Sequence, residues 1–169
     1  MLKLEKAQIN DLDYLKEMAV NVVENMHKNG INLWNKYYPA EEFEQCIKDE
    51  ILYVAKKGNN IISFFVLVEG DETAENYDWK FDKEIYLQKF AINVDFLHKG
   101  YGKSVLDLII NYLKEKDYNS FRFTVYDKNL PAIGLYKKLG FNIVKGSYLM
   151  INKNRKEEPK LFIGMEYKL

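Results

Sequence analysis

The residues best suited to chemistry lie between Phe90 and Ser104, where an apolar strand pattern turns through two glycines into an amphipathic helix pattern. Gly100 and Gly102 let the backbone bend sharply and approach a ligand closely. Successive N–H groups in such a turn, followed by the positive amino end of a helix, can hold a phosphate or pyrophosphate without any side chain. Lys103 and Ser104 could add a charge and a hydroxyl. The stretch therefore predicts an anion site.

The segment Gly102-Lys103-Ser104 also matches the end of a Walker A loop, the phosphate-binding turn of many nucleotide-binding proteins. That motif requires another glycine five residues before Gly102, and Leu97 stands there. A nucleotide-binding P-loop protein is therefore a distant alternative, which tight binding of Mg-ATP would revive.

Two residues further along the chain are candidates for ligand contacts, although each also fits a structural role. Asn129 stands where a helix pattern begins, with Pro131 in its first turn, and an N-cap of this kind stabilises a helix by about 1 kcal/mol. Tyr136 shares a helix face with Ala132 and Leu139, as a core tyrosine with a hydrogen-bonded hydroxyl would.

The elements that must position these residues follow from the hydrophobic periodicity of the chain. Strands are predicted near residues 1–6, 51–57, 61–69, 84–94, 121–126, 142–151 and 160–167, and helices near 12–29, 40–49, 102–116 and 130–139. The helix over 102–116 joins two neighbouring strands, and such a crossover implies that these strands run parallel. Ligands of open sheets bind at the carboxyl ends of such strands, where the glycine turn lies.

Composition limits the class of protein. The chain has 169 residues, of which 47% are hydrophobic, and we expect residues 1–169 to form a single domain with its own core. Lys plus Arg and Asp plus Glu both number 25, so no global charge favours a nucleic-acid or membrane partner. The longest apolar run, residues 61–68, is too short to span a bilayer, and the amino terminus does not resemble a signal peptide. A cytoplasmic location is therefore expected.

Metal chemistry is not expected. The chain has one cysteine, Cys46, and two histidines, His27 and His98, which lie far apart in the sequence. Cys46 falls on a predicted helix and is expected to be inert rather than an acyl carrier. His98 is expected to face solvent in the turn.

Three motifs in order make residues 86–141 resemble the acyl-CoA-binding half of the GCN5-related N-acetyltransferase (GNAT) superfamily. The first is the strand end Phe90-Ala91-Ile92 with the turn His98-Lys99-Gly100-Tyr101-Gly102-Lys103; the second is Asn129, seven residues before Tyr136; the third is Leu135-Tyr136-Lys137-Lys138-Leu139-Gly140-Phe141. The flanking element order resembles the family over nearly the whole chain. Two positions depart from its pattern: Leu97 replaces the usual Arg or Gln, and Thr124 stands where some members carry a glutamate proposed as general base.

The resemblance implies a mixed α/β fold of the GNAT kind. Its central sheet of about six to seven strands would be flanked by about four helices, with a bulge splaying one parallel strand pair at the cofactor site. The implied activity is transfer of an acetyl group from acetyl-CoA to a primary amine, directly within a ternary complex and without a metal. The cofactor-binding residues implied are Phe90, Ala91, Ile92, His98, Lys99, Gly100, Tyr101, Gly102, Lys103, Ser104, Asn129 and Tyr136.

The remaining roles are less constrained by the resemblance. Tyr136 would be the general acid that protonates the departing thiolate, and Glu84 is the candidate general base, with Tyr86 or a water chain as alternatives. Trp34 and Tyr37 would line the acceptor pocket or simply pack in the core. A small molecule or a peptide could supply the amine.

Several alternatives stay open. A GNAT-like domain that binds acyl-CoA without transferring it, as a sensor or interaction module, would suit the residues found at Leu97 and Thr124. The acidic stretch 69–82 could attract a cationic amine, but a solvated loop is the expected role. The chain could form a homodimer, and it could use acyl groups other than acetyl.

Overall fold

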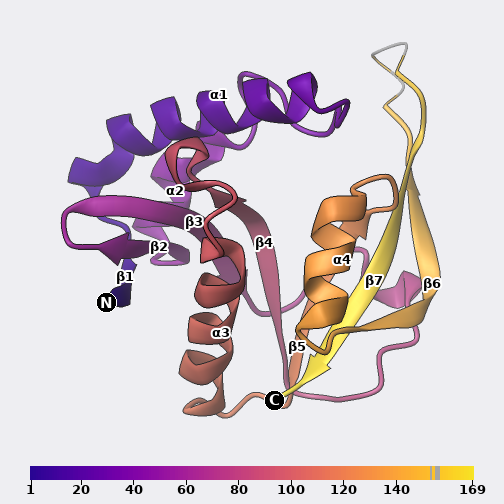
Figure 1. The fold of residues 1–169 in the computed structure, drawn as a ribbon. Coiled ribbons are helices and arrows are strands. Elements are labelled where there is room, and N and C mark those ends of the chain that lie inside the picture. The colour runs from indigo at the N-terminus through magenta and orange to yellow at the C-terminus, as the bar shows by residue number, and fades with distance from the viewer. Residues whose placement is uncertain (153, 155–156) are drawn as a thin grey trace. The chain divides into compact units, whose positions relative to one another are not determined.

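The computed structural model describes residues 1–152, 154 and 157–169 (Figure 1). Within these residues the chain forms a seven-stranded mixed sheet and four α-helices, so the predicted fold class is confirmed. The strand order is β1-β2-β3-β4-β5-β7-β6. The strands are β1 (Leu2–Lys6), β2 (Leu52–Lys57), β3 (Asn60–Val68), β4 (Glu84–Ile92), β5 (Ser120–Tyr126), β6 (Asn142–Met150) and β7 (Lys160–Lys168), and the α-helices are α1 (Leu12–Lys28), α2 (Phe43–Lys48), α3 (Tyr101–Lys114) and α4 (Leu130–Lys138).

The chain divides into two compact units. The first comprises Met1–Val68 and Leu87–Tyr112, and the second comprises Glu69–Tyr86 and Leu113–Leu169. Both β4 and α3 therefore contribute residues to both units.

In the first unit, the apolar stripe of α1 forms much of the core. Leu15, Met18 and Val22 are buried on this stripe and belong to the same cluster as Phe43 of α2 and Phe64 of β3. Fully burying a side chain of this size stabilises the fold by roughly 1.5–3 kcal/mol. Strands β1, β2 and β3 pair antiparallel in this order, and a tight turn at Gly58 and Asn59 joins β2 to β3.

In the second unit, the predicted parallel pairing is confirmed, since Glu84, Ile85 and Tyr86 of β4 pair with Ser120, Phe121 and Arg122 of β5. Strand β7 pairs antiparallel with both β5 and β6. Alternate residues of β5 point to one face, where Phe123 meets Tyr136 of α4 with ring centroids 4.3 Å apart. Helix α4 therefore packs against this face of the sheet.

Residues 69–82, which we call the connector, differ in part from the expected solvated loop. Their carboxylates at Glu72, Glu75, Asp78 and Asp82 are exposed, as expected. The backbone, however, is anchored: Tyr77 bridges Gly146 of β6, and the Asp78 N–H donates to the Lys145 carbonyl at 2.8 Å. The Tyr77 hydroxyl donates to the Phe162 carbonyl at 3.0 Å. The prediction was right for the side chains and wrong for the backbone.

In the part of the chain that the structure describes, no helix is long and apolar enough to cross a membrane. The same residues bring together no group of three or more His, Cys, Asp or Glu side chains that could hold a metal ion.

Candidate active site

One side of the end of β4 is hydrogen-bonded to β3, which belongs to the same unit. The Ser63 hydroxyl donates to the Ala91 carbonyl at 2.7 Å, and the Asn93 N–H donates to the Ile62 carbonyl at 2.8 Å. Because the backbone groups of alternate strand residues point to opposite sides, those of Phe90 and Ile92 point away from β3. Phe90 and Ile92 are two of the three residues predicted to contact the cofactor at this end of β4.

Asn93 is a residue of this region that the sequence analysis did not identify. Its side chain is buried, donates to the Tyr14 hydroxyl and the Ile61 carbonyl at 3.0 Å each, and accepts from the Asp95 N–H at 3.1 Å. These contacts fix the point where β4 ends and the turn begins. An asparagine two residues before an aspartate, directly after an apolar strand, was the signal that could have revealed it.

The turn after β4 depends on two left-handed residues, and only one of them is a glycine. His98 has φ +58° and Gly100 has φ +79°, whereas Gly102 lies inside α3. The expectation that both glycines form the bend is therefore wrong for Gly102. The first hydrogen bond of the helix runs from the Ser104 N–H to the Gly100 carbonyl at 3.2 Å. The N–H groups before it have no partner within the helix, as an anion site requires.

The side chains of the turn are mostly engaged within the protein. Lys103 pairs with Asp107 at 2.6 Å, and Lys99 donates to the Asp95 carbonyl at 2.8 Å. The Ser104 hydroxyl donates to the Gly100 carbonyl at 3.3 Å, and Lys57 donates to the Tyr101 hydroxyl at 2.8 Å. His98 is exposed, as expected. The backbone of the turn, rather than its charged side chains, is therefore the group best placed to receive an anion.

Asn129, in the second unit, has the N-cap role that its position predicted. Its side-chain oxygen accepts from the Ala132 N–H at 3.4 Å, and its carbonyl accepts from the Ile133 N–H at 3.1 Å. Only the side-chain oxygen is used in this cap, so the amide NH₂ group can still donate to a ligand.

Tyr136 lies on the face of α4 that packs against the sheet. The residue is 8% exposed, and its ring contacts those of Phe123 and Phe141. Burial raises the pKa of Tyr136, which keeps the phenol neutral. The structure thus shows the packed tyrosine expected of a core position, with a protonated hydroxyl that can donate a hydrogen bond.

The candidate acceptor residues Trp34 and Tyr37 have different surroundings. Trp34 is buried, stacks on Phe64 at 6.3 Å and meets Tyr38 edge-on at 6.3 Å. Tyr37 is 56% exposed, with the Lys36 ammonium 5.0 Å from its ring centroid. Of the two, Tyr37 is the side chain that a ligand in solution can reach.

The candidate base Glu84 lies half-buried at the start of β4, in register with Ser120. Thr124 of β5, at the position where some family members carry a glutamate, lies opposite Gly164 of β7. Buried Cys46 has its thiol pKa raised by burial, which makes the thiolate scarce and agrees with the expected inert role.

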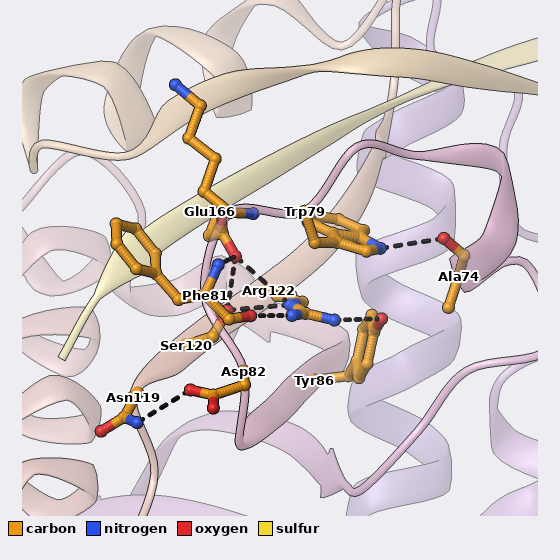
Figure 2. Close-up of polar contacts among 10 residues, drawn as sticks. Ala74, Trp79, Phe81, Asp82, Tyr86, Asn119, Ser120, Arg122 and Glu166 are labelled. Atoms are coloured by element: carbon orange, nitrogen blue, oxygen red, sulfur yellow. Dashed lines mark hydrogen bonds and ion pairs between the residues drawn. The ribbon is translucent and has the colours of Figure 1, made fainter.

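A buried polar cluster in the second unit was missed by the sequence analysis (Figure 2). Arg122 forms an ion pair with Glu166 at 3.3 Å and donates to the Ser120 hydroxyl at 2.8 Å and the Tyr86 hydroxyl at 3.3 Å. Its guanidinium also donates to the Phe81 carbonyl and lies 4.9 Å from the Trp79 ring centroid. The signal was an arginine and a glutamate within otherwise apolar strands, which need a partner when buried.

Glu166 connects this cluster to the backbone of the connector. Its carboxylate accepts from the Lys80 N–H at 2.9 Å, the Phe81 N–H at 3.3 Å and the Ser120 hydroxyl at 2.6 Å. The described residues leave no buried side-chain polar atom without a partner, so the network is fully satisfied. It fixes the end of the connector beside the first residues of β4.

Known proteins are similar to this chain in sequence and in fold. The model of the Acetyltransferase (GNAT) family matches residues 19–141. A curated relative, the N-acetyltransferase 9-like protein of Schizosaccharomyces pombe, is 28% identical over 114 residues, and the match covers 63% of this chain and 53% of the relative. The chain thus spans about half the length of that relative.

Solved structures share the fold at low sequence identity. A GNAT family acetyltransferase of Streptococcus agalactiae has a TM-score of 0.80 at 14% identity, covering 99% of this chain and 95% of that one. A protein of Salmonella typhimurium, solved with its cofactor acetyl-CoA, has a TM-score of 0.69 at 13% identity, covering 99% and 94%. With the family match over most of its length, this chain belongs to the GNAT family of acetyltransferases.

Proposed function

We propose that this protein is an acetyl-CoA-dependent N-acetyltransferase that transfers the acetyl group directly to a primary amine in a ternary complex. The observation that carries the proposal is the turn at His98 and Gly100, which opens α3 with N–H groups that have no partner within the helix, in a chain that belongs to the GNAT family. Those N–H groups would hold the pyrophosphate of coenzyme A.

The backbone of β4 would bind the other end of the cofactor. The groups of Phe90 and Ile92 point away from β3 and can pair with the pantetheine amides, as the family resemblance implies. An N–H group held there can also polarise the thioester carbonyl, where negative charge develops during attack. The cofactor supplies the activated acetyl group, and the protein positions it.

Tyr136 would donate a hydrogen bond to the departing sulfur. A buried phenol with a raised pKa is a weaker acid than free tyrosine, so Tyr136 would keep its proton and stabilise the departing thiolate through the hydrogen bond. The Asn129 amide, free on its NH₂ side, would contact the cofactor as in the family.

The acceptor amine must lose a proton before attack, and Glu84, six residues before Phe90 on β4, is the proposed base, reaching the amine through a chain of waters. Tyr86 suits this role less well. Burial raises its pKa even though Arg122 opposes the shift, and its hydroxyl already accepts from that guanidinium at 3.3 Å. Exposed Tyr37 would contribute to the acceptor side, with a small-molecule or peptide amine as the substrate.

Titration calorimetry with acetyl-CoA and coenzyme A tests binding, and release of free thiol with a broad panel of amines tests transfer. Binding together with amine-dependent thiol release is the expected result. Failure to bind at millimolar concentration would overturn the proposal, whereas binding without turnover by any amine would assign the chain as an acyl-CoA-binding module. Intact-mass measurement without acceptor should show no acetyl group on Cys46, because transfer is direct.

A further inference from the structure

Lys89 is an unusual residue of β4. It has φ +52°, a left-handed conformation in the middle of a strand, immediately before Phe90. Residues with a Cβ atom avoid this conformation, and glycine is the usual choice where a strand needs it. Such a residue persists only where the surrounding contacts determine it.

The contacts that hold Lys89 come from its own side chain. Only 7% of that side chain is exposed, and its ammonium forms an ion pair with Glu42 at 2.8 Å. The same ammonium lies 5.2 Å from the ring centroid of Tyr38. All three residues belong to the first unit.

The charge of Lys89 is stable in this environment. Burial by itself lowers the pKa of Lys89, but the Tyr38 phenol and the Glu42 carboxylate outweigh burial, so the pKa is raised. A buried ammonium is costly unless it is paired, and therefore the side chain stays where Glu42 and Tyr38 are. A fixed side chain in turn restricts the backbone from which it extends.

We propose that Lys89 is a positioning residue for the cofactor site. Its ammonium, held by Glu42 and Tyr38, keeps β4 in the left-handed conformation that directs the backbone groups of Phe90 and Ile92 toward the thioester arm of acetyl-CoA. This inference rests on the proposed function, because it concerns the same strand backbone. It adds a side chain that acts through the backbone and never touches the cofactor.

The expected effect follows from a population argument. If the strand adopts the competent conformation only a tenth of the time without the ion pair, the apparent affinity for acetyl-CoA falls about tenfold. The value of kcat at saturating acetyl-CoA should stay unchanged, because bound cofactor selects the competent strand. A loss of general stability would not produce this division between KM and kcat.

The test compares substitutions at one position. Lys89→Ala removes the ion pair and still disfavours a positive φ, so acetyl-CoA should bind about tenfold more weakly. Lys89→Gly removes the same ion pair but accepts a positive φ, so its affinity should stay within about threefold of the wild type. Lys89→Arg keeps the charge and should also bind nearly normally.

Two further variants complete the set. Glu42→Gln removes the charge of the half-exposed partner of Lys89 and should lower the affinity for acetyl-CoA by about threefold. This variant tests the proposal if Lys89→Ala does not fold. Lys48→Ala, the matched control, removes an exposed ion pair of α2 with Glu44 and should leave affinity unchanged.

Calorimetric titration with acetyl-CoA gives outcomes that separate the two proposals. Absence of binding by the wild type refutes the proposed function itself. If the wild type binds, equal affinity of Lys89→Ala and wild type overturns the positioning role. Equal weakening of Lys89→Ala and Lys89→Gly overturns it as well, since the charge and not the backbone conformation would then matter. If Lys89→Ala does not fold, unchanged affinity in Glu42→Gln is the overturning result.

Discussion

At the scale of single residues, Tyr136 combines a packed position with a protonated hydroxyl. Its ring lies 4.3 Å from that of Phe123, and burial keeps its phenol neutral. Removing only the hydroxyl therefore tests chemistry with little change in packing.

We expect Tyr136→Phe to lower kcat by about 100-fold, because the departing sulfur loses the hydrogen bond proposed to stabilise it, while acetyl-CoA affinity stays within about twofold. Because its pKa is raised, Tyr136 should add no alkaline limb to the pH–rate profile near pH ~10, where a free tyrosine would lose its proton. Steady-state kinetics with calorimetry measures both. An equal loss of kcat and of affinity would assign Tyr136 a packing role instead.

Gly100 has a backbone conformation that alanine adopts only at a cost. Its φ is +79°, and no atom would lie near an added Cβ, so the effect of Gly100→Ala comes from the backbone alone. We expect a stability loss of about 1 kcal/mol and about tenfold weaker binding of acetyl-CoA as the turn relaxes.

Gly70→Ala is the matched control for this change. Gly70 has φ +76° with equally open surroundings, and it lies in the connector. The Gly70→Ala variant should lose as much free energy of unfolding as Gly100→Ala, measured by urea denaturation, and should keep its affinity for acetyl-CoA. Equal binding losses in both variants would show that strain at any turn, and not this turn, limits binding.

At the scale of elements, the buried network around Arg122 determines the path of the connector. Arg122→Met leaves the Glu166 carboxylate buried without its ion-pair partner, and we expect a loss of about 3–5 kcal/mol in the free energy of unfolding. Glu166→Met should cost a similar amount. The double substitution should cost clearly less than the sum, because the two residues share one interaction.

Urea denaturation of the single and double variants measures this coupling. Asp117→Ala provides the comparison, since it removes the exposed ion pair between Lys83 and Asp117 and should leave the free energy of unfolding nearly unchanged. Strict additivity of the two buried substitutions would show that the ion pair does not couple them.

The sequence predicted the elements that carry their own local signals. Helix α1 ends within one residue of the end of the helix predicted near 12–29, and α4 begins at its asparagine cap with proline in the first turn. The docking of the connector could not be predicted, because Tyr77 and Phe81 bond to residues about 85 positions away, beyond the reach of any periodicity. The left-handed conformations of His98 and Lys89 could not be predicted for a related reason. Neither residue is a glycine, and tertiary contacts determine the conformation of Lys89.

At the scale of the whole molecule, stability should depend on alkaline pH through the buried tyrosines. Burial, more than the nearby Asp71, raises the pKa of Tyr77 to about 12. The folded value lies above the unfolded value of about 10, so the stabilising contribution is complete below pH ~10 and is lost as pH rises toward ~12.

Tyr77→Phe should therefore reduce stability by about 1 kcal/mol at neutral pH, through loss of the hydrogen bond to Phe162, and flatten the alkaline decline. Urea denaturation between about pH 8 and pH 11 measures the difference. Tyr37→Phe, at an exposed position, should follow the wild type throughout. A decline in Tyr77→Phe as steep as in the wild type would refute the assignment.

The path of the chain through its two units limits how the protein can be dissected. The chain passes from one unit to the other after Val68, Tyr86 and Tyr112, so no single cut releases either unit intact. The turn at Gly100 and the phenol of Tyr136 thus cannot be isolated in two truncated fragments. Circular permutation or split-protein complementation is the route by which the contribution of each could be measured separately.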